Sequence, residues 1–213
     1  NDGSSWQNAF TKLESAIGKV CENDEIWVAE GTYIPEQGKA FNLVDKVKIY
    51  GGFASVGDPK MDERNWDLYK TILKGNENSV FINYSSQEFP ITNETILDGF
   101  ILEEGTGNPK MLFTLTAGGA ICNTNASPTL RNLIIRNNSA EFGAAIYNSE
   151  NSNPILINCL IVENEYIGSN PINNTSASSV IFNRDTTGNT KLINCTLVNN
   201  NASAISSYNQ PTT

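Results

Sequence analysis

A pattern of asparagine and aliphatic residues recurs at near-constant spacing along the second half of the chain. Residues 118–138 are repeated at 143–164 with an offset of 25 and then 26 residues, and a further copy is displaced by another 35 or 36. An earlier copy, ILDGFILEEG at residues 96–105, has the same spacing. Self-similarity with a period of about 20 to 50 residues is typical of solenoids, in which each repeat stacks on the next. The repeat therefore predicts a stacked, elongated fold.

The residue types inside the repeat decide which solenoid it is. Each unit holds short segments rich in Ile, Leu, Val and Thr, separated by Asn and Gly, and none has helical spacing. The units read L-x-N-[LC]-x-[IL]-x-x-N, whereas a leucine-rich repeat requires LxxLxLxxN. The pattern predicts an all-β chain folded as a parallel β-helix.

Stacking in such a coil gives the asparagines a structural role. Equivalent residues lie about 4.8 Å apart, so each amide can donate to the asparagine of the next rung, and asparagine tolerates the left-handed backbone of a sharp bend. We expect three ladders: Asn132, Asn158 and Asn194; Asn138, Asn164 and Asn200; Asn123, Asn148 and Asn183. Gly99 and Gly105 should continue the first two. Leu130, Leu156 and Leu192 should stack inward.

We expect a single domain over residues 1–213. Residues 1–22 are predicted to be an N-terminal cap, because Trp6, Phe10, Leu13, Ile17 and Val20 fall on one face of an amphipathic helix. Residues 23–92 should form less regular rungs with a long charged loop at 54–70, and residues 93–213 the regular rungs. The segment NQPT near the end resembles the turns that open a rung, which predicts that further rungs and a C-terminal cap are missing.

Charge and composition exclude several classes of function. The chain has 14 Lys and Arg against 23 Asp and Glu, and a net charge of -9 repels nucleic acid and polyanionic sugars. Histidine is absent, which excludes Ser-His-Asp and Cys-His catalysis. The four cysteines lack CxxC spacing, so we expect no metal and no cofactor. No apolar run is long enough to span a membrane.

One carboxylate group lies on a recognisable rung and is the candidate catalytic site. It consists of Asp98, Glu103 and Glu104, with Arg131 and Arg136 in the next copy. The favoured interpretation is cross-rung ion pairs on a solvated face. The alternative is a catalytic site, with Ca²⁺ as its only conceivable cofactor.

Aromatic residues mark candidate ligand-binding positions. The 54–70 loop carries a mixture that can stack on a sugar ring and bond to its hydroxyls: Asp58, Asp62, Glu63, Arg64, Trp66, Asp67 and Tyr69. The other interpretation of Trp66 is an anchor packed against the coil. Trp27 alternates with Ile26 and Val28 and so should face outward, unless the register slips by one residue.

Apolar residues at outward positions form a candidate partner surface. They are Ile101, Ile134 and Leu160 in one column, with Ile157 and Val162 in two others. An exposed apolar stripe requires a cover. Either the insertion near residues 166–176 or a neighbouring loop folds over it, or a partner molecule binds there.

The repeats resemble a known bacterial family. GGAI at 118–121 and GAAI at 143–146, followed by IxxN or LxxN, resemble the polymorphic outer membrane proteins, although those pair GGAI with FxxN. The front half, with GSSWQNAF, DEIWVAEGTYIP and VKIYGGF, is similar to right-handed β-helix proteins of the pectin-lyase-like superfamily.

These resemblances carry expectations about function. They imply a right-handed coil, export to the surface of a Gram-negative bacterium, association with the outer membrane, and adhesion to a glycan or a host or cell-surface protein. The alternative from the same superfamily is a polysaccharide lyase or glycoside hydrolase, for which the sequence shows no recognisable motif.

Overall fold

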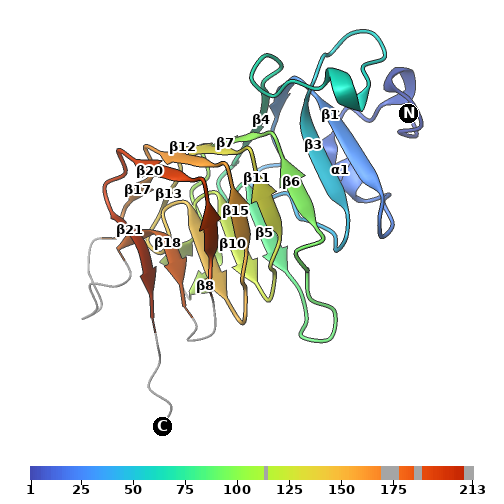
Figure 1. The fold of residues 1–213 in the computed structure, drawn as a ribbon. Helices are drawn as coiled ribbons and strands as arrows, with labels where there is room; N and C mark the ends of the chain where they lie inside the picture. Colours follow the sequence, from blue (N-terminus) through green and yellow to red (C-terminus); the bar gives the residue numbers. More distant parts are fainter. Residues whose placement is uncertain (113–114, 169–177, 185–188, 209–213) are drawn as a thin grey trace.

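The computed structural model describes residues 1–112, 115–168, 178–184 and 189–208. Three long parallel sheets stack around a common core, in the manner of a β-helix (Figure 1). The first sheet contains β1 (Glu25–Ala29), β3 (Lys48–Phe53), β6 (Ile96–Asp98), β11 (Thr129–Arg131), β15 (Ile155–Ile157) and β19 (Lys191–Ile193). The second contains β2 (Gly31–Tyr33), β4 (Thr71–Lys74), β7 (Ile101–Glu103), β12 (Ile134–Arg136), β16 (Leu160–Val162) and β20 (Thr196–Val198).

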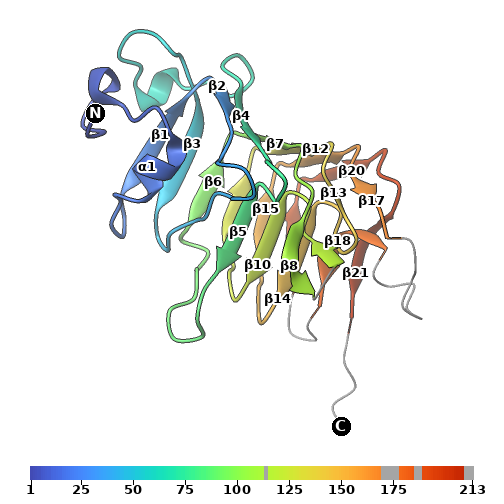
Figure 2. The same cartoon turned by 180° about the vertical axis from the view of Figure 1, so that it is seen from behind.

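The third sheet lies on the opposite side and is seen best from behind (Figure 2). Its strands are β5 (Phe81–Tyr84), β10 (Ile121–Thr124), β14 (Ile146–Ser149), β18 (Ser179–Asn183) and β21 (Ser203–Ser207). Two small sheets complete the strands: antiparallel β8 (Asn108–Leu112) with β9 (Leu115–Ala117), and parallel β13 (Ser139–Ala140) with β17 (Glu165–Tyr166). The chain thus passes from sheet to sheet and returns one rung further along.

The strand register confirms the alignment of the repeats. Leu97, Leu130, Leu156 and Leu192 pair in sequence across the first sheet. Ile121, Ile146 and Ile181 pair in the same way across the third. These side chains belong to one hydrophobic core inside the coil, because every second residue of a strand points to the same face.

The three asparagine ladders are also confirmed, and one is longer than predicted. Asn123 donates to Asn148 at 2.8 Å, and Asn83 extends this ladder by donating to Asn123 at 2.8 Å. Of the three ladders, only that of Asn132, Asn158 and Asn194 consists of asparagines with a left-handed backbone, with φ angles between 51° and 54°. In the ladder of Asn138 the left-handed residue is the one before each asparagine, as at Asn137 with φ 54°.

The helix predicted over residues 6–20 is wrong in extent. The segment forms a 3-10 turn, η1 (Trp6–Asn8), and a single short helix, α1 (Leu13–Ile17). Tertiary contacts override the helical pattern: the Trp6 ring lies 5.5 Å from that of Phe53, and its Nε1 donates to the Pro59 carbonyl at 3.0 Å. Leu13 and Ile17 still join the core, beside β1.

Candidate binding groove

A groove of about 230 Å³ opens on the outer side of the coil, between the second sheet and the 54–70 loop. Its lining combines an apolar floor with a polar rim. The lining residues are Trp66, Asp67, Lys70, Thr71, Gly99, Phe100, Ile101, Asn132, Leu133, Ile134, Asn158 and Leu160. Two features that the sequence marked separately, the charged loop and the apolar column, therefore meet in one place.

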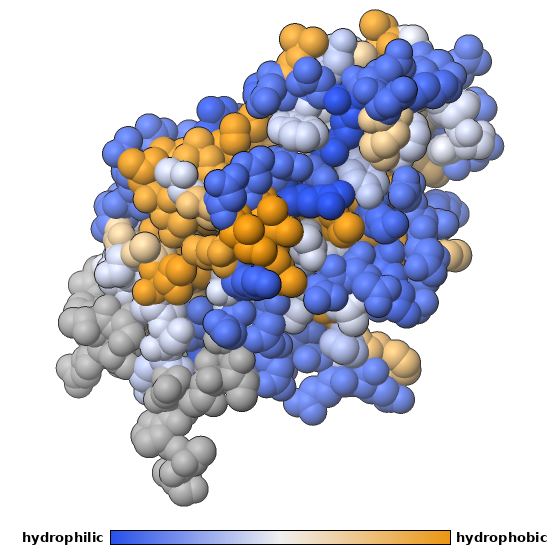
Figure 3. Space-filling model, viewed as in Figure 1, coloured by the Kyte–Doolittle hydropathy of each residue, from blue (hydrophilic) through white to orange (hydrophobic). Residues whose placement is uncertain are grey.

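The floor of the groove is the predicted outward column. Ile101 pairs with Ile134, and Ile134 with Leu160, along β7, β12 and β16. Ile101 is only 7% exposed, whereas Ile134 and Leu160 are half-buried. Hydrophobic side chains form a broad patch on this face of the molecule (Figure 3). The groove occupies the part of the patch that adjoins the loop.

The 54–70 loop forms the opposite wall. It contains a short 3-10 helix, η2 (Met61–Glu63), and returns to the coil at Asn65, whose backbone N–H donates to the Gly52 carbonyl at 2.8 Å. Gly52 has φ 91°, and a Cβ there would lie 2.8 Å from the Trp66 backbone. Glycine is required at this position because it gives the backbone the unusual conformation and leaves room for the loop. Trp66 is half-buried and borders the groove.

Arg64 fastens this loop to the coil. Its side chain is 7% exposed, and its Nε donates to the Gly51 carbonyl at 2.5 Å. Its Nη2 donates to both the backbone and the side-chain oxygen of Asp98 at 2.7 Å. The guanidinium also lies over two aromatic rings, 5.2 Å from Tyr50 and 4.8 Å from Trp66, in the geometry of a cation–π contact.

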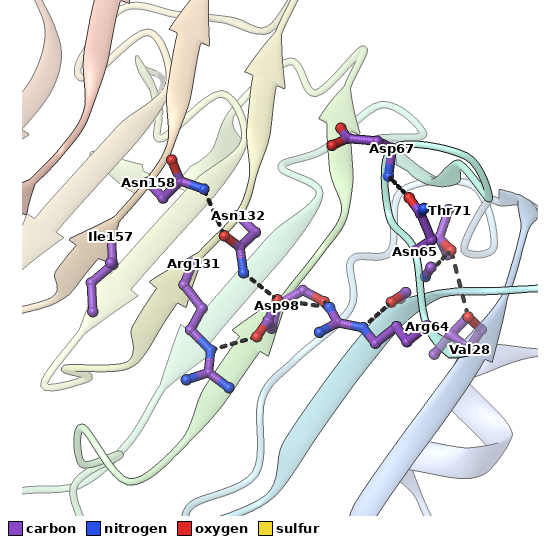
Figure 4. Close-up of polar contacts among 12 residues, drawn as sticks. Val28, Arg64, Asn65, Asp67, Thr71, Asp98, Arg131, Asn132, Ile157 and Asn158 are labelled. Atoms are coloured by element: carbon purple, nitrogen blue, oxygen red, sulfur yellow. Dashed lines mark hydrogen bonds and ion pairs between the residues drawn. The ribbon is translucent and has the colours of Figure 1, made fainter. Parts of the chain in front are cut away.

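Asp98 lies at the centre of the polar contacts in Figure 4. Its carboxylate is 2% exposed and accepts hydrogen bonds from Arg64, from Arg131 on the next rung, and from the Asn132 amide at 2.8 Å. The ladder of Asn132, Asn158 and Asn194 begins at this point, since Asn158 donates to Asn132 at 2.8 Å. The predicted ion pair with Arg131 is present; its carboxylate is buried, whereas the Arg131 side chain is 36% exposed.

The other two candidate carboxylates, Glu103 and Glu104, pair with a separate set of cations. Glu103 is 6% exposed and pairs with Arg136 at 2.8 Å and with Lys74 of β4 at 3.3 Å. Glu104 also contacts Lys74 and is exposed; its bond to Lys74 is the largest cause that raises the pKa of that lysine. Neither glutamate lines the groove. The candidate catalytic residues are therefore divided between two ion-pair clusters on neighbouring sheets.

The other predicted site residues lie outside the groove. Trp27 faces outward and is half-buried, with its ring stacked on Phe53 at 5.0 Å and an interplanar angle of 7°. Asp62 is exposed and Tyr69 is half-buried, and neither lines the groove. Ile157 and Val162 are half-buried on the adjoining outer surface. Most of the insertion near residues 166–176, expected as a cover, lies outside the described residues.

Several groove residues were missed by sequence reasoning. Asn132 and Asn158 were predicted only as ladder residues, although the repeat places them beside the outward column. Lys70, which pairs with Asp67 at 3.6 Å, was not singled out within the loop. Within the described ranges no cluster of three or more metal-ligating side chains occurs, and no helix is long and apolar enough to cross a membrane.

Comparisons with protein-family models, curated proteins and solved structures return no match for this chain, so both family resemblances remain predictions from sequence motifs.

Proposed function

We propose that the protein is a non-catalytic binding module that holds a neutral glycan in the groove between Trp66 and the column of Ile101, Ile134 and Leu160. The observation that carries the proposal is the composition of this groove, which combines an aromatic wall, an aliphatic floor and asparagine amides. Sugar rings present apolar faces and hydroxyl edges, and small-molecule sites typically pair an apolar lining with a few polar groups. A negatively charged chain disfavours polyuronates.

Binding is favoured over catalysis by the state of the carboxylates. A general acid or base must be within hydrogen-bond reach of its substrate. Asp98 is 2% exposed and already accepts from Arg64, Arg131 and Asn132. Glu103 is held by two cations and does not border the groove. These groups are thus engaged in holding rungs and loop together.

We further propose that the coil is right-handed, that the segment containing α1 caps its first rung, and that the protein acts outside a Gram-negative cell as a surface adhesin. The support is the two sequence resemblances, together with the burial of Leu13 and Ile17 against the core next to β1. A segment that covered the free edge of β1 would prevent that edge from pairing with another chain.

The test is calorimetric titration of the protein with a panel of neutral and uronate oligosaccharides. We expect a neutral oligosaccharide to bind, and Trp66→Ala to weaken that binding at least about tenfold, because truncation of an aromatic anchor is costly. Phe89→Ala is the matched control, since Phe89 is 73% exposed and lies outside the groove.

Two results would contradict the proposal. If no saccharide of the panel binds, or if Trp66→Ala and Phe89→Ala bind equally well, the groove is not a glycan site. If incubation releases new reducing ends or unsaturated products, the protein is a hydrolase or lyase instead.

A further inference from the structure

We infer that Arg64 is a positioning residue, which holds the 54–70 loop against the coil and so builds the Trp66 wall of the groove. The effect on ligand binding rests on the proposed function, whereas the effect on the loop does not. Arg64 itself does not line the groove, so it acts through the neighbouring Trp66.

The guanidinium connects three parts of the molecule at once. It bonds to the Gly51 carbonyl on β3 and to two oxygens of Asp98 on β6, so it spans two successive rungs. It also lies over the Trp66 ring, two residues further along its own loop. A planar group with several fixed donors can satisfy these contacts together, whereas an ammonium group cannot.

The coil leaves a matching space for this side chain. Gly99 follows Asp98 with φ 81°, and a Cβ at this position would lie 2.2 Å from Nη2 of Arg64 and 3.1 Å from Cβ of Trp66. In the next rung the equivalent position is Asn132, which keeps the left-handed backbone at φ 53° but carries a side chain. The rung that contacts Arg64 therefore has glycine at the position where the next rung has asparagine.

The contact between Arg64 and Asp98 is buried, so its loss should carry a large energetic cost. Removal of one partner leaves the other charge in a place with little access to water, which is costly. Asp98 would retain Arg131 and Asn132, both from the next rung. The coil therefore keeps a partner for its carboxylate, while the loop loses its bonds to Gly51 and Asp98, and we expect local opening of the loop rather than loss of the fold.

The test measures hydrogen exchange of the backbone amides of residues 61–70 in the full chain without ligand. These include Asn65 and Tyr69, whose N–H groups donate to the carbonyls of Gly52 and Asn65. We expect exchange in this segment to rise about tenfold or more in Arg64→Leu, and by less in Arg64→Lys, which keeps the charge. Exchange in β10 and β14 should be unchanged.

Lys74→Leu is the matched control. Like Arg64, Lys74 is a cation that pairs with a buried carboxylate of the following rung, here Glu103. Unlike the Arg64 loop, Lys74 does not border the groove. We expect this variant to leave exchange at residues 61–70 unchanged. A neutral oligosaccharide that binds the parent protein should bind Lys74→Leu equally well and Arg64→Leu at least about tenfold more weakly.

The inference is overturned if exchange at residues 61–70 does not change in Arg64→Leu, or if it rises equally throughout the coil. It is also overturned if the loop opens but the oligosaccharide binds Arg64→Leu as tightly as the parent protein. If no saccharide binds any variant, the proposed function fails, and the exchange measurement still decides whether Arg64 holds the loop.

Discussion

Burial controls the chemistry of two of the four cysteines, none of which forms a disulfide in the structure. Removal from water raises the pKa of the Cys122 thiol to about 12, and the same cause raises the pKa of Cys159 to about 12. A raised thiol pKa favours the protonated form, and only the thiolate is a nucleophile. At pH 8 these two groups should be inert, with roughly one thiol in ten thousand ionised.

A disulfide reagent at pH 8 tests this expectation. Cys21 is exposed and should react rapidly in the native protein. Cys122 and Cys159 should react only after denaturation, when all four thiols become available. Peptide mapping after labelling identifies the sites, and rapid labelling of Cys159 in the native protein would show that its surroundings are open to solvent.

At the scale of the structural element, the asparagine ladders differ in burial and should therefore differ in how much they contribute to the free energy of unfolding. Asn123 is fully buried, accepts from Asn83 and donates to Asn148, both at 2.8 Å. Asn123→Ala leaves two buried polar groups without these partners, and each costs about 1 to 3 kcal/mol. We expect a loss of about 2 to 6 kcal/mol in the free energy of unfolding, measured by urea denaturation.

The exposed ladder supplies the control for this prediction. Asn158 has φ 54° and is exposed, so Asn158→Gly retains the backbone conformation and water replaces the amide contacts. We expect a loss below about 1 kcal/mol, chiefly from the greater freedom of glycine in the unfolded chain. Equal losses at Asn123 and Asn158 would mean that the ladders stabilise through the backbone alone.

The same elements show what the sequence could predict. The register of Leu130 on Leu156 follows from the repeat, because stacked rungs place like residues in contact. The outward column was found in the same way. The attachment of the loop through Arg64 has no such periodic signal, since it depends on how an irregular segment folds back. The N-terminal helix was overpredicted because the contact of Trp6 with Phe53 joins residues 47 positions apart, which local periodicity does not show.

At the scale of the whole molecule, a solenoid differs from a globular domain in how its stability is distributed. Each rung contacts only its neighbours, so stability is approximately a sum over rungs and the interfaces between them. Leu130 is fully buried and pairs with Leu97 on one side and Leu156 on the other. Leu192 is half-buried and, within the described chain, its register partner is Leu156.

Identical substitutions at these two stacked positions should therefore have unequal effects. We expect Leu130→Ala to cost about 2 to 5 kcal/mol, because it opens a cavity between two rungs. Leu192→Ala should cost half of this or less, because less apolar surface is lost from water and a single interface is affected. Urea denaturation of residues 1–213 measures both. Equal losses would indicate that the coil unfolds as a unit in which every rung depends on all the others, contrary to nearest-neighbour stacking.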